Sequence, residues 1–275
     1  MKKRLIIHIF IFSFFSLWAN PEPNTLSDSK IADFRLATLP KAGTHLLVKC
    51  LYLLGALPEI SESKFGGITL SQKLQENHGW HLNAAILDGI YSSSHKYLIM
   101  VRDVRDAILS IHNWMPYLWI KLDRPDLYEK TINSFEGDAD KQIYNLIIQN
   151  PDASGSSLLG LYHLAILLYN QREQLPNIMF IKFEDLIGQN GGGDLSKQCQ
   201  TIKKIVEFLD IVTISDKEIQ TIAEKLWGDT ETFNVSNSKG QVGTWKKKLK
   251  REHIQAIDHH WNEYLSLFGY EIEAK

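Results

Sequence analysis

Short apolar runs alternate with longer segments of helical periodicity along this 275-residue chain, and this order restricts the fold more than any other feature. The runs predict buried strands at residues 34–39, 96–101 and 178–183. Amphipathic spacing predicts helices at residues 44–57, 105–115, 156–175, 195–209, 215–227 and 251–268. Strands that are joined through helices pair in parallel, and both faces of such a sheet are covered. The sequence therefore predicts an α/β fold with a mainly parallel central sheet and helices on both faces.

The sequence predicts a single domain over residues 31–275. It contains no internal repeat, and its length suits one large α/β domain. Residues 20–30 are polar and contain two prolines, which indicates a linker, and residues 188–194 (GQNGGGD) indicate a flexible surface loop. With 44% hydrophobic and 23% charged residues, the composition is typical of a folded protein and excludes a largely disordered one.

Residues 1–19 differ from the rest of the chain. A basic MKKR segment precedes an uncharged apolar run at residues 5–19, which is shorter than the roughly 20 residues of a membrane-spanning helix. This pattern predicts a secretory signal peptide. Leu17 and Trp18 do not match the small residues of a cleavage site, so an uncleaved membrane anchor stays open, as does a buried N-terminal helix. We therefore expect the domain to be exported, or anchored to a membrane and located outside the cytoplasm.

Charge and cysteine content argue against several function classes. The formal net charge of −2 gives no basis for nucleic-acid binding, so an anion site has to be a local basic cluster. Cys50 and Cys199 are too few for a disulfide framework, and each lies in a helical apolar pattern that predicts a buried thiol. The His, Cys and Asp residues have no metal-ligand spacing, so we expect no metal cofactor.

The turn after the first predicted strand, LPKAGTH at residues 39–45, has the residues of an anion-binding loop. In parallel α/β folds, ligands bind at the carboxyl ends of the strands, and phosphate groups bind at helix N-termini. Gly43 lets the backbone approach an anion, and Lys41 adds a mobile positive charge. A Walker A loop requires GxxxxGK[ST], with the lysine after the second glycine, and the sequence lacks that order.

Two further segments contain candidate anion ligands. In VRDVRDAILS, residues 101–110, Arg102 ends a predicted strand and Ser110 follows about two helical turns later. The alternative for this segment is a solvated helix start that Asp103 caps. Residues 238–250, SKGQVGTWKKKLK, place two glycines and a tryptophan among five lysines. This basic run is either a solvated surface or a loop that closes over phosphate.

In this order, the segments resemble the PAPS-dependent sulfotransferases, whose donor is 3′-phosphoadenosine 5′-phosphosulfate (PAPS). LPKAGTH is similar to the 5′-phosphosulfate loop of that family, and YLIMVRDVRDAILS to its strand and helix for the 3′-phosphate. FIKFEDL is similar to a later strand with an acidic turn, and KGQVGTWKKKL to a late KGxxGxWK segment. The resemblance covers residues 34–270. It implies a P-loop-like fold and metal-independent transfer of a sulfuryl group from PAPS to a hydroxyl or amine of a small-molecule or carbohydrate acceptor.

The resemblance also implies the residues of the site. Lys41 would bind the 5′-phosphosulfate and stabilise the bridging oxygen as its bond to sulfur breaks. Arg102 and Ser110 would hold the 3′-phosphate, which suits an arginine fork and a hydroxyl donor. The full set of implied donor-binding residues is Lys41, Ala42, Gly43, Thr44, His45, Leu46, Arg102, Ser110, Lys239 and Gly240. The last two would close over the 3′-phosphate.

Transfer to a hydroxyl requires a general base near neutral pH, and the family has a histidine for it in a K-T-H-L-P element. His81 precedes Arg102 by twenty-one residues and is followed by a leucine, so the resemblance implies that His81 is the base. The two residues before His81 differ from the lysine and threonine of that element. His78 is the reserve candidate, and His95 and His45 are the remaining histidines of these segments.

Other departures keep alternative functions open. Leu46 stands where the cytosolic branch has an adenine-stacking tryptophan, so Trp227 or Phe233 would have to supply that platform. Ser238 replaces an arginine that contacts the 3′-phosphate in the family. The alternatives are a divergent P-loop nucleotide kinase and a non-catalytic protein that binds a nucleotide or a sulfated glycan. Residues 114–157 are rich in aromatic side chains, and we expect them to form the acceptor wall.

Overall fold

The structure is a computed structural model of the chain. It describes residues 32–63, 66–79, 82, 89–91, 94–121, 138–148, 160–211, 214–236 and 239–272. The predicted signal or anchor segment and the linker therefore lie outside the described residues, as do His81 and Ser238.

A parallel sheet forms the centre of the fold, as the alternation of strands and helices predicts. It contains β1 (Phe34–Leu36), β4 (Lys96–Val101) and β5 (Ile178–Lys182) in the order β1-β4-β5. Both pairings are parallel, with Phe34 opposite Lys96 and Tyr97 opposite Ile178. β4 is the middle strand, and its last five residues are buried, which explains why KYLIMV is apolar on both faces. A separate antiparallel pair, β2 (Ser61–Glu62) and β3 (Ile68–Thr69), was not predicted.

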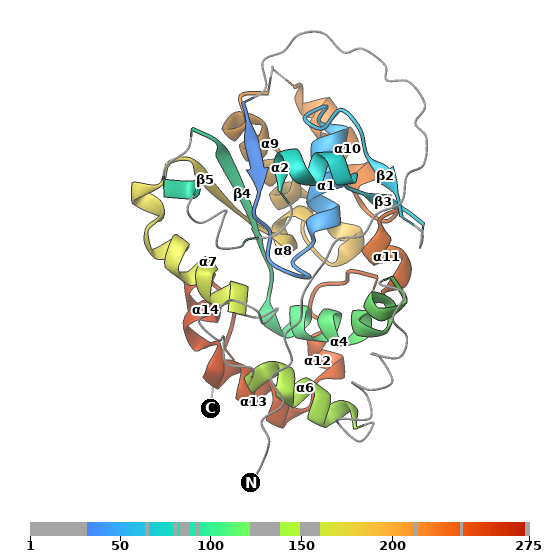
Figure 1. The fold of residues 1–275 in the computed structure, drawn as a ribbon, viewed down its shortest axis with the longest axis vertical. Coiled ribbons are helices and arrows are strands. Elements are labelled where there is room, and N and C mark those ends of the chain that lie inside the picture. Colours follow the sequence, from blue (N-terminus) through green and yellow to red (C-terminus); the bar gives the residue numbers. More distant parts are fainter. Residues whose placement is uncertain are drawn as a thin grey trace.

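Helices flank the sheet, which confirms the predicted fold class (Figure 1). α1 (Thr44–Leu53) follows β1, α4 (Val104–Lys121) follows β4, and α8 (Phe183–Leu186) follows β5. The remaining helices are α2 (Gln72–His78), α6 (Ala139–Ile148), α7 (Gly160–Asn170), α9 (Leu195–Phe208), α10 (Asp216–Leu226), α11 (Glu231–Val235), α12 (Trp245–Lys248), α13 (Arg251–His260) and α14 (Asn262–Leu267), with short 3-10 turns η1 (Arg172–Gln174) and η2 (Gln189–Gly191). Figure 1 shows α4, α6, α12 and α13 gathered beyond the carboxyl end of β4.

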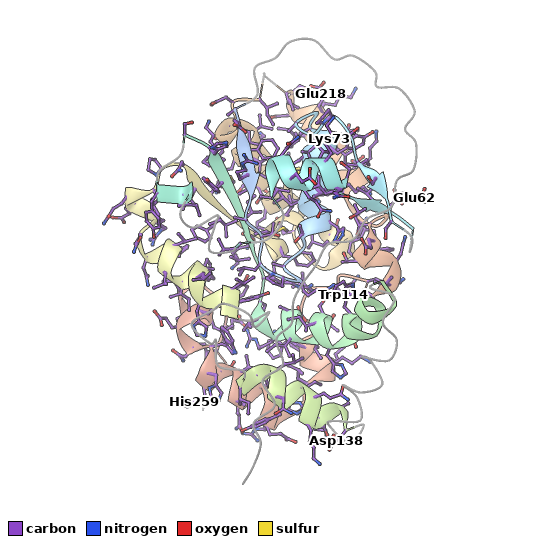
Figure 2. All side chains as sticks on the ribbon, in the orientation of Figure 1. Glu62, Lys73, Trp114, Asp138, Glu218 and His259 are labelled. Atoms are coloured by element: carbon purple, nitrogen blue, oxygen red, sulfur yellow. The ribbon has the colours of Figure 1, made fainter. Side chains whose placement is uncertain are left out.

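The core lies between the sheet and the helices around it. Leu36, Leu98 and Leu47 are fully buried, and one contiguous cluster of apolar side chains includes all three. Figure 2 shows the exposed Glu62, Lys73 and Glu218 at the periphery, whereas Trp114 lies toward the middle of the molecule. None of the helices in the described part of the chain is long and apolar enough to span a membrane.

The two cysteines are free thiols with different surroundings. Cys50 is buried, as predicted, and burial raises the pKa of its thiol to about 12. Cys199 lies on α9 and is only partly buried, so the prediction of a buried thiol is wrong there. Cys199 follows the buried Gln198 on α9 and lies about 100° further around the helix, so it packs only against the edge of the core.

Two local predictions differ from the structure. The predicted helix at residues 251–268 is divided into α13 and α14 at Trp261, which is 2% exposed and packs against Tyr162 with ring centroids 6.0 Å apart. The GQNGGGD segment lies at the surface as predicted, with Gln189, Asn190 and Gly192 exposed, but it also forms η2 and buries Gly191. In both places long-range packing determines the backbone, and the local pattern does not indicate it.

Candidate active site

The loop between β1 and α1 is held in an unusual backbone conformation. Lys41 has φ 60° and Gly43 has φ 104°, both in the left-handed region. A Cβ at Gly43 would lie 2.4 Å from Cδ2 of Phe183, so only glycine fits this position. The Tyr162 hydroxyl donates a 2.9 Å hydrogen bond to the Pro40 carbonyl and so fixes the start of the loop. Ala42 is completely buried, and its N–H donates to the Leu39 carbonyl.

The loop leads directly into the first turn of α1. First-turn N–H groups have no intrahelical acceptor, and the helix dipole adds partial positive charge there. Thr44 Oγ1 lies 2.6 Å from Thr38 Oγ1, in a buried hydrogen bond that ties this turn to the end of β1. The Leu46 N–H already donates to the Gly43 carbonyl at 2.9 Å, so Gly43, Thr44 and His45 supply the amides that remain candidates for an anion.

The next two side chains of α1 are turned into the protein. His45 Nε2 lies 3.2 Å from Glu231 Oε2, and both residues are buried. Leu46 is 6% exposed and belongs to the apolar core. His45 thus connects the loop to α11. Leu46 has no exposed face on which a ring could stack.

Arg102 joins the three sequence motifs. Its Nη1 donates to the Lys41 carbonyl at 3.3 Å, and its Nη2 donates to the Gln241 carbonyl at 3.4 Å. The guanidinium lies 4.2 Å from the ring centroid of Phe183. Arg102 therefore touches the turn after β1 and the start of α8 after β5, and it also reaches the late glycine-rich segment.

Arg102 is buried and forms no direct ion pair among the described residues, although the nearby carboxyls of Asp106 and Glu184 feel its charge. The residue is 5% exposed, and its Nε is buried and has no hydrogen-bond partner in the described part of the chain. Burying a cation is costly unless an anion or strong acceptors compensate it, and here the two partners are long carbonyl contacts. The arrangement favours an anionic ligand beside this guanidinium.

The start of α4 is buried, so the alternative of a solvated helix start is wrong. Arg105 is 1% exposed and pairs with Asp103 through two hydrogen bonds of 2.9 Å. It also donates to Asp258 at 3.4 Å and lies 3.9 Å from the ring centroid of Trp245. Asp103 does accept from the Arg105 N–H, as a cap would, but the charges are enclosed by the C-terminal helices.

Asp106 holds the late glycine-rich segment, a role that the sequence did not reveal. Its two carboxylate oxygens accept hydrogen bonds from the Gly243 N–H at 2.7 Å and the Trp245 N–H at 2.9 Å. Burial raises the pKa of this carboxyl, opposed by the charge of Arg102 and by the two amides. The sequence feature that could have indicated this role is the second aspartate of the RDVRD motif. Its partners lie more than 130 positions away, which local reasoning does not reach.

The predicted closing residues, Lys239 and Gly240, lie in the same segment. Lys239 has φ 48°, and its Nζ donates to the carbonyls of Phe233 and Asn234, each at 3.2 Å. Gly240 has φ 70°, and a Cβ there would lie 3.7 Å from Cζ of Phe183. The segment thus approaches the Phe183 ring, while the Lys239 side chain is directed toward α11.

The GQNGGGD segment supports the same region from the other side. Gln241 Nε2 donates to the Asn190 carbonyl, and the Val242 N–H donates to the Gly191 carbonyl, each at 2.9 Å. A Cβ at Gly191 would lie 2.2 Å from Cγ1 of Ile187, so the close packing requires glycine. This turn is therefore part of the framework of the site.

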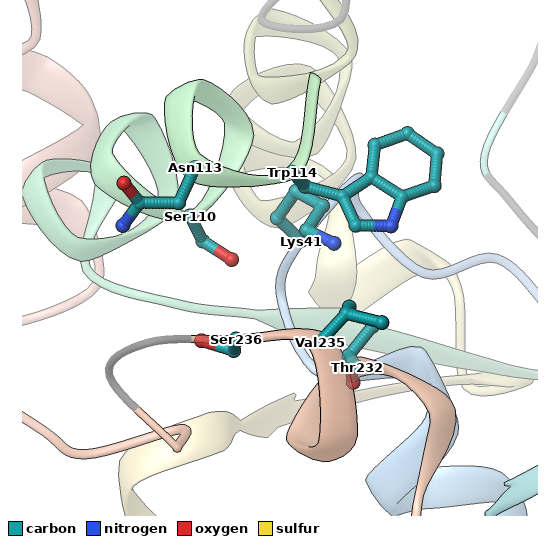
Figure 3. A pocket seen from close by; sticks show the side chains of 7 residues that line it. All are labelled: Lys41, Ser110, Asn113, Trp114, Thr232, Val235 and Ser236. Carbon is teal, nitrogen blue, oxygen red and sulfur yellow. The ribbon is translucent and has the colours of Figure 1, made fainter. Parts of the chain in front are cut away.

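Lys41 and Ser110, which come from two of the motifs, line the same small pocket (Figure 3). Ser110 and Trp114 lie one helical turn apart on α4, and Lys41 Nζ lies 4.3 Å from the ring centroid of Trp114. α11 and the residue after it form the opposite wall. The lining residues are Lys41, Ser110, Asn113, Trp114, Thr232, Val235 and Ser236.

The histidines that were considered as the general base lie in different parts of the chain. The predicted base, His81, lies outside the described residues. His78 is the last residue of α2. His95 lies just before β4, with Nε2 2.9 Å from Asp33 Oδ2, and hence at the opposite end of that strand from Arg102. This location removes His95 from the candidates for a base.

The candidate adenine platforms contact each other. The rings of Trp227 and Phe233 pack edge to face with centroids 5.2 Å apart. Within the described part of the chain, no group of His, Cys, Asp or Glu side chains is arranged to hold a metal ion.

These features define an α/β protein whose candidate anion ligands meet at the carboxyl ends of parallel strands. A model of the sulfotransferase domain matches residues 32–269, and the chain therefore belongs to the sulfotransferase family. Among solved structures, the chain is similar to mouse sulfotransferase SULT7A1 complexed with PAP, with a TM-score of 0.55 and 18% sequence identity. That match covers 85% of this chain and 84% of the mouse chain, and it supports the fold. No curated protein matches the sequence.

Proposed function

We propose that this protein transfers a sulfuryl group from PAPS to a hydroxyl or amine of a small-molecule or carbohydrate acceptor. The observation that carries the proposal is the buried Arg102 guanidinium, which bridges two predicted donor-binding segments and whose Nε has no hydrogen-bond partner among the described residues. The mouse relative was solved with PAP, the product that PAPS leaves after transfer, and this agrees with the proposed donor.

In this proposal the two phosphate ends of the donor bind different elements. The amides of Gly43, Thr44 and His45 and the Lys41 ammonium bind the 5′-phosphosulfate, with Ala42 and Leu46 shaping the two ends of the loop. Arg102 and Ser110 bind the 3′-phosphate, with Lys239 and Gly240 closing over it. Lys239 would exchange the two α11 carbonyls that it now contacts for a phosphate oxygen. Phe183, which touches Gly43 and Arg102, would keep the two phosphate sites at a fixed separation.

The proposed reaction is a single displacement at sulfur. The acceptor oxygen forms a bond to sulfur while the bond between sulfur and the bridging oxygen breaks, and PAP leaves with the electron pair. Lys41 stabilises the negative charge that develops on the bridging oxygen, and His81 takes the acceptor proton. Holding both substrates in line contributes the remaining acceleration. The indole of Trp114, at the pocket, starts the proposed acceptor wall.

Calorimetric titration with PAP and an assay with radiolabelled PAPS and a broad acceptor panel test the proposal. We expect PAP binding, transfer to at least one acceptor, and activity that is insensitive to EDTA. A purified protein that does not bind PAP would contradict the proposal. Preference for ATP with magnesium would favour the kinase alternative, and tight PAP binding without transfer would favour a non-catalytic binder.

We further propose that residues 1–19 direct the domain out of the cytoplasm, either as a cleaved signal or as an anchor formed by residues 5–19. The basic start and the apolar run support this proposal. Because PAPS is made in the cytosol, an exported enzyme also needs a donor supply on the other side of the membrane. A fusion of residues 1–30 to a reporter that is active only after export tests the proposal, and a reporter that stays cytoplasmic would contradict it.

A further inference from the structure

We propose that Trp114 is a positioning residue for Lys41, whose ammonium it holds inside the pocket by a cation–π contact. Lys41 Nζ lies 4.3 Å from the ring centroid of Trp114, well within the range of such contacts. Figure 3 shows the lysine amine beside the indole, with Ser110 on the same side of the pocket. This inference rests on the proposed role of Lys41 at the 5′-phosphosulfate.

The backbone of each residue brings the two side chains together. Lys41 is held in the left-handed region, and its carbonyl accepts the hydrogen bond from Arg102. Strained backbone of this kind persists where the surroundings impose it, as they often do at functional sites. Trp114 lies on the same face of α4 as Ser110, one turn further along. The lysine therefore leaves its loop toward α4 and meets the indole.

An indole suits this task better than a carboxylate. A lysine side chain is long and flexible, so a freely moving ammonium would lose much entropy when it binds a ligand. A carboxylate would restrain it but would also cancel its charge and repel the donor phosphates. The face of a tryptophan restrains the cation and leaves its full positive charge available to an anion. Trp114 thus prepares Lys41 for the donor without competing for it.

A double-mutant cycle on PAP affinity tests whether Trp114 acts through Lys41. The four proteins are the full chain, Trp114→Leu, Lys41→Met and the double variant, and the affinity is measured by calorimetry. Trp114→Leu should weaken PAP binding by roughly 2-fold to 30-fold, the span that cation–π contacts provide. In the Lys41→Met background the same substitution should have little effect. Trp114→Phe, which keeps an aromatic face, should recover most of the affinity.

The contact itself is tested without any ligand by NMR of the lysine side chains. The Hε resonance of Lys41, assigned by its absence in Lys41→Met, should be shifted upfield by the indole ring current, and Trp114→Leu should remove the shift. An unshifted resonance in the parent protein would overturn the inference. So would an equal loss of PAP affinity from Trp114→Leu in both backgrounds, because Trp114 would then affect donor binding independently of Lys41. A parent protein that shows the shifted resonance but does not bind PAP would instead overturn the proposed function, and the positioning role with it.

Discussion

The imidazole of His45 lies 3.2 Å from the carboxylate of Glu231, and the contact links the first turn of α1 to α11 across the buried interior. α11 also carries Thr232 and Val235, which line the pocket opposite Ser110. The pair therefore fixes the distance between the predicted phosphate loop and the far wall of the pocket. The family resemblance gave His45 a place in the loop. The structure turns its ring away from the pocket and toward Glu231.

Removing the partner of His45 should both destabilise the fold and weaken donor binding. Glu231→Ala deletes a buried acceptor, and we expect a loss of about 1–3 kcal/mol in the free energy of unfolding. Glu231→Gln keeps an acceptor and should lose less. Urea denaturation gives the stability, and PAP titration gives the affinity, which should fall in the same order. A Glu231→Ala protein with unchanged stability would show that the contact contributes nothing.

Asp106 should matter for PAP affinity although it need not touch the donor. Asp106→Asn replaces one of the two acceptor oxygens by an amide NH2 group. This group is a donor that faces a backbone N–H, so one of the hydrogen bonds to Gly243 and Trp245 is lost. The lost hydrogen bond should cost about 1–2 kcal/mol and leave this segment less ordered. PAP binding should therefore weaken by roughly 5-fold to 30-fold. Asp216→Asn is the matched control, since that carboxylate is 85% exposed, and it should bind PAP as the parent does. Equal affinities in all three proteins would contradict the anchoring role.

The same carboxyl should make stability depend on pH. Burial raises the pKa of Asp106 in the folded state above its ordinary value. The folded protein therefore binds this proton more tightly than the unfolded chain, and the contribution of Asp106 to stability is greatest below about pH 3.9. It declines as the pH rises through the raised pKa and is constant above it. Urea denaturation from pH 4 to 8 should show that Asp106→Asn gains stability relative to the parent as the pH rises. A constant difference would be inconsistent with the raised pKa.

Gly191 should be required for packing and not for its backbone freedom. Gly191→Ala would place a Cβ 2.2 Å from Ile187 Cγ1 and 2.7 Å from Trp227 Cζ3, and we expect a loss of about 1–3 kcal/mol in stability. Gly55→Ala is the matched control, because Gly55 has φ 71° and a Cβ built there has nothing within 4 Å. This variant should lose only the roughly 1–2 kcal/mol that a left-handed backbone costs an alanine.

The two glycine variants should also differ in PAP affinity. Only Gly191→Ala disturbs the turn whose carbonyl accepts from the Val242 N–H, so only that variant should bind PAP more weakly than the parent does. Gly55 lies just after α1, away from the late glycine-rich segment. If both variants bind PAP normally at a temperature where they are folded, η2 does not support the site.

The kinetic roles of His81 and Lys41 should be separable. His81→Ala should lower turnover by roughly 100-fold to 10,000-fold with little change in donor affinity, because a general base faces the acceptor. Lys41→Ala should weaken donor binding and lower turnover together, since its charge acts in both the ground state and the transition state. Steady-state rates with PAPS and PAP affinities distinguish the two patterns.

His78→Ala is the control for the assignment of the base and should have nearly the activity of the parent. Activity that is lost in His78→Ala and kept in His81→Ala would show that the base is one helical turn earlier in the sequence. If neither substitution matters, the base is another residue. His45 would then be a poor substitute, because its ring contacts Glu231 in the interior.

Local sequence patterns were enough to predict the three strands of the central sheet, most of the helices and the order of the motifs. β4 has the predicted bounds, and α1 begins at the residue after Gly43, because apolar runs and glycine act locally on the backbone. The parallel sheet also followed, since strands joined through helices have few other arrangements. From that topology the LPKAGTH turn was expected between the carboxyl end of β1 and a helix, and the structure has it there.

Which charges are buried, and which groups they bind, depends on how the helices pack around the sheet. RDVRD fits a solvated helix start and a buried network equally well by local rules, and the packing of Trp245 and Asp258 over Arg105 made it buried. The partners of Arg102 lie 61 and 139 residues away, so no local pattern could identify them. Burial and long-range hydrogen bonds are properties of the assembled fold, because each depends on side chains that meet only when all three strands end at the same edge of the sheet.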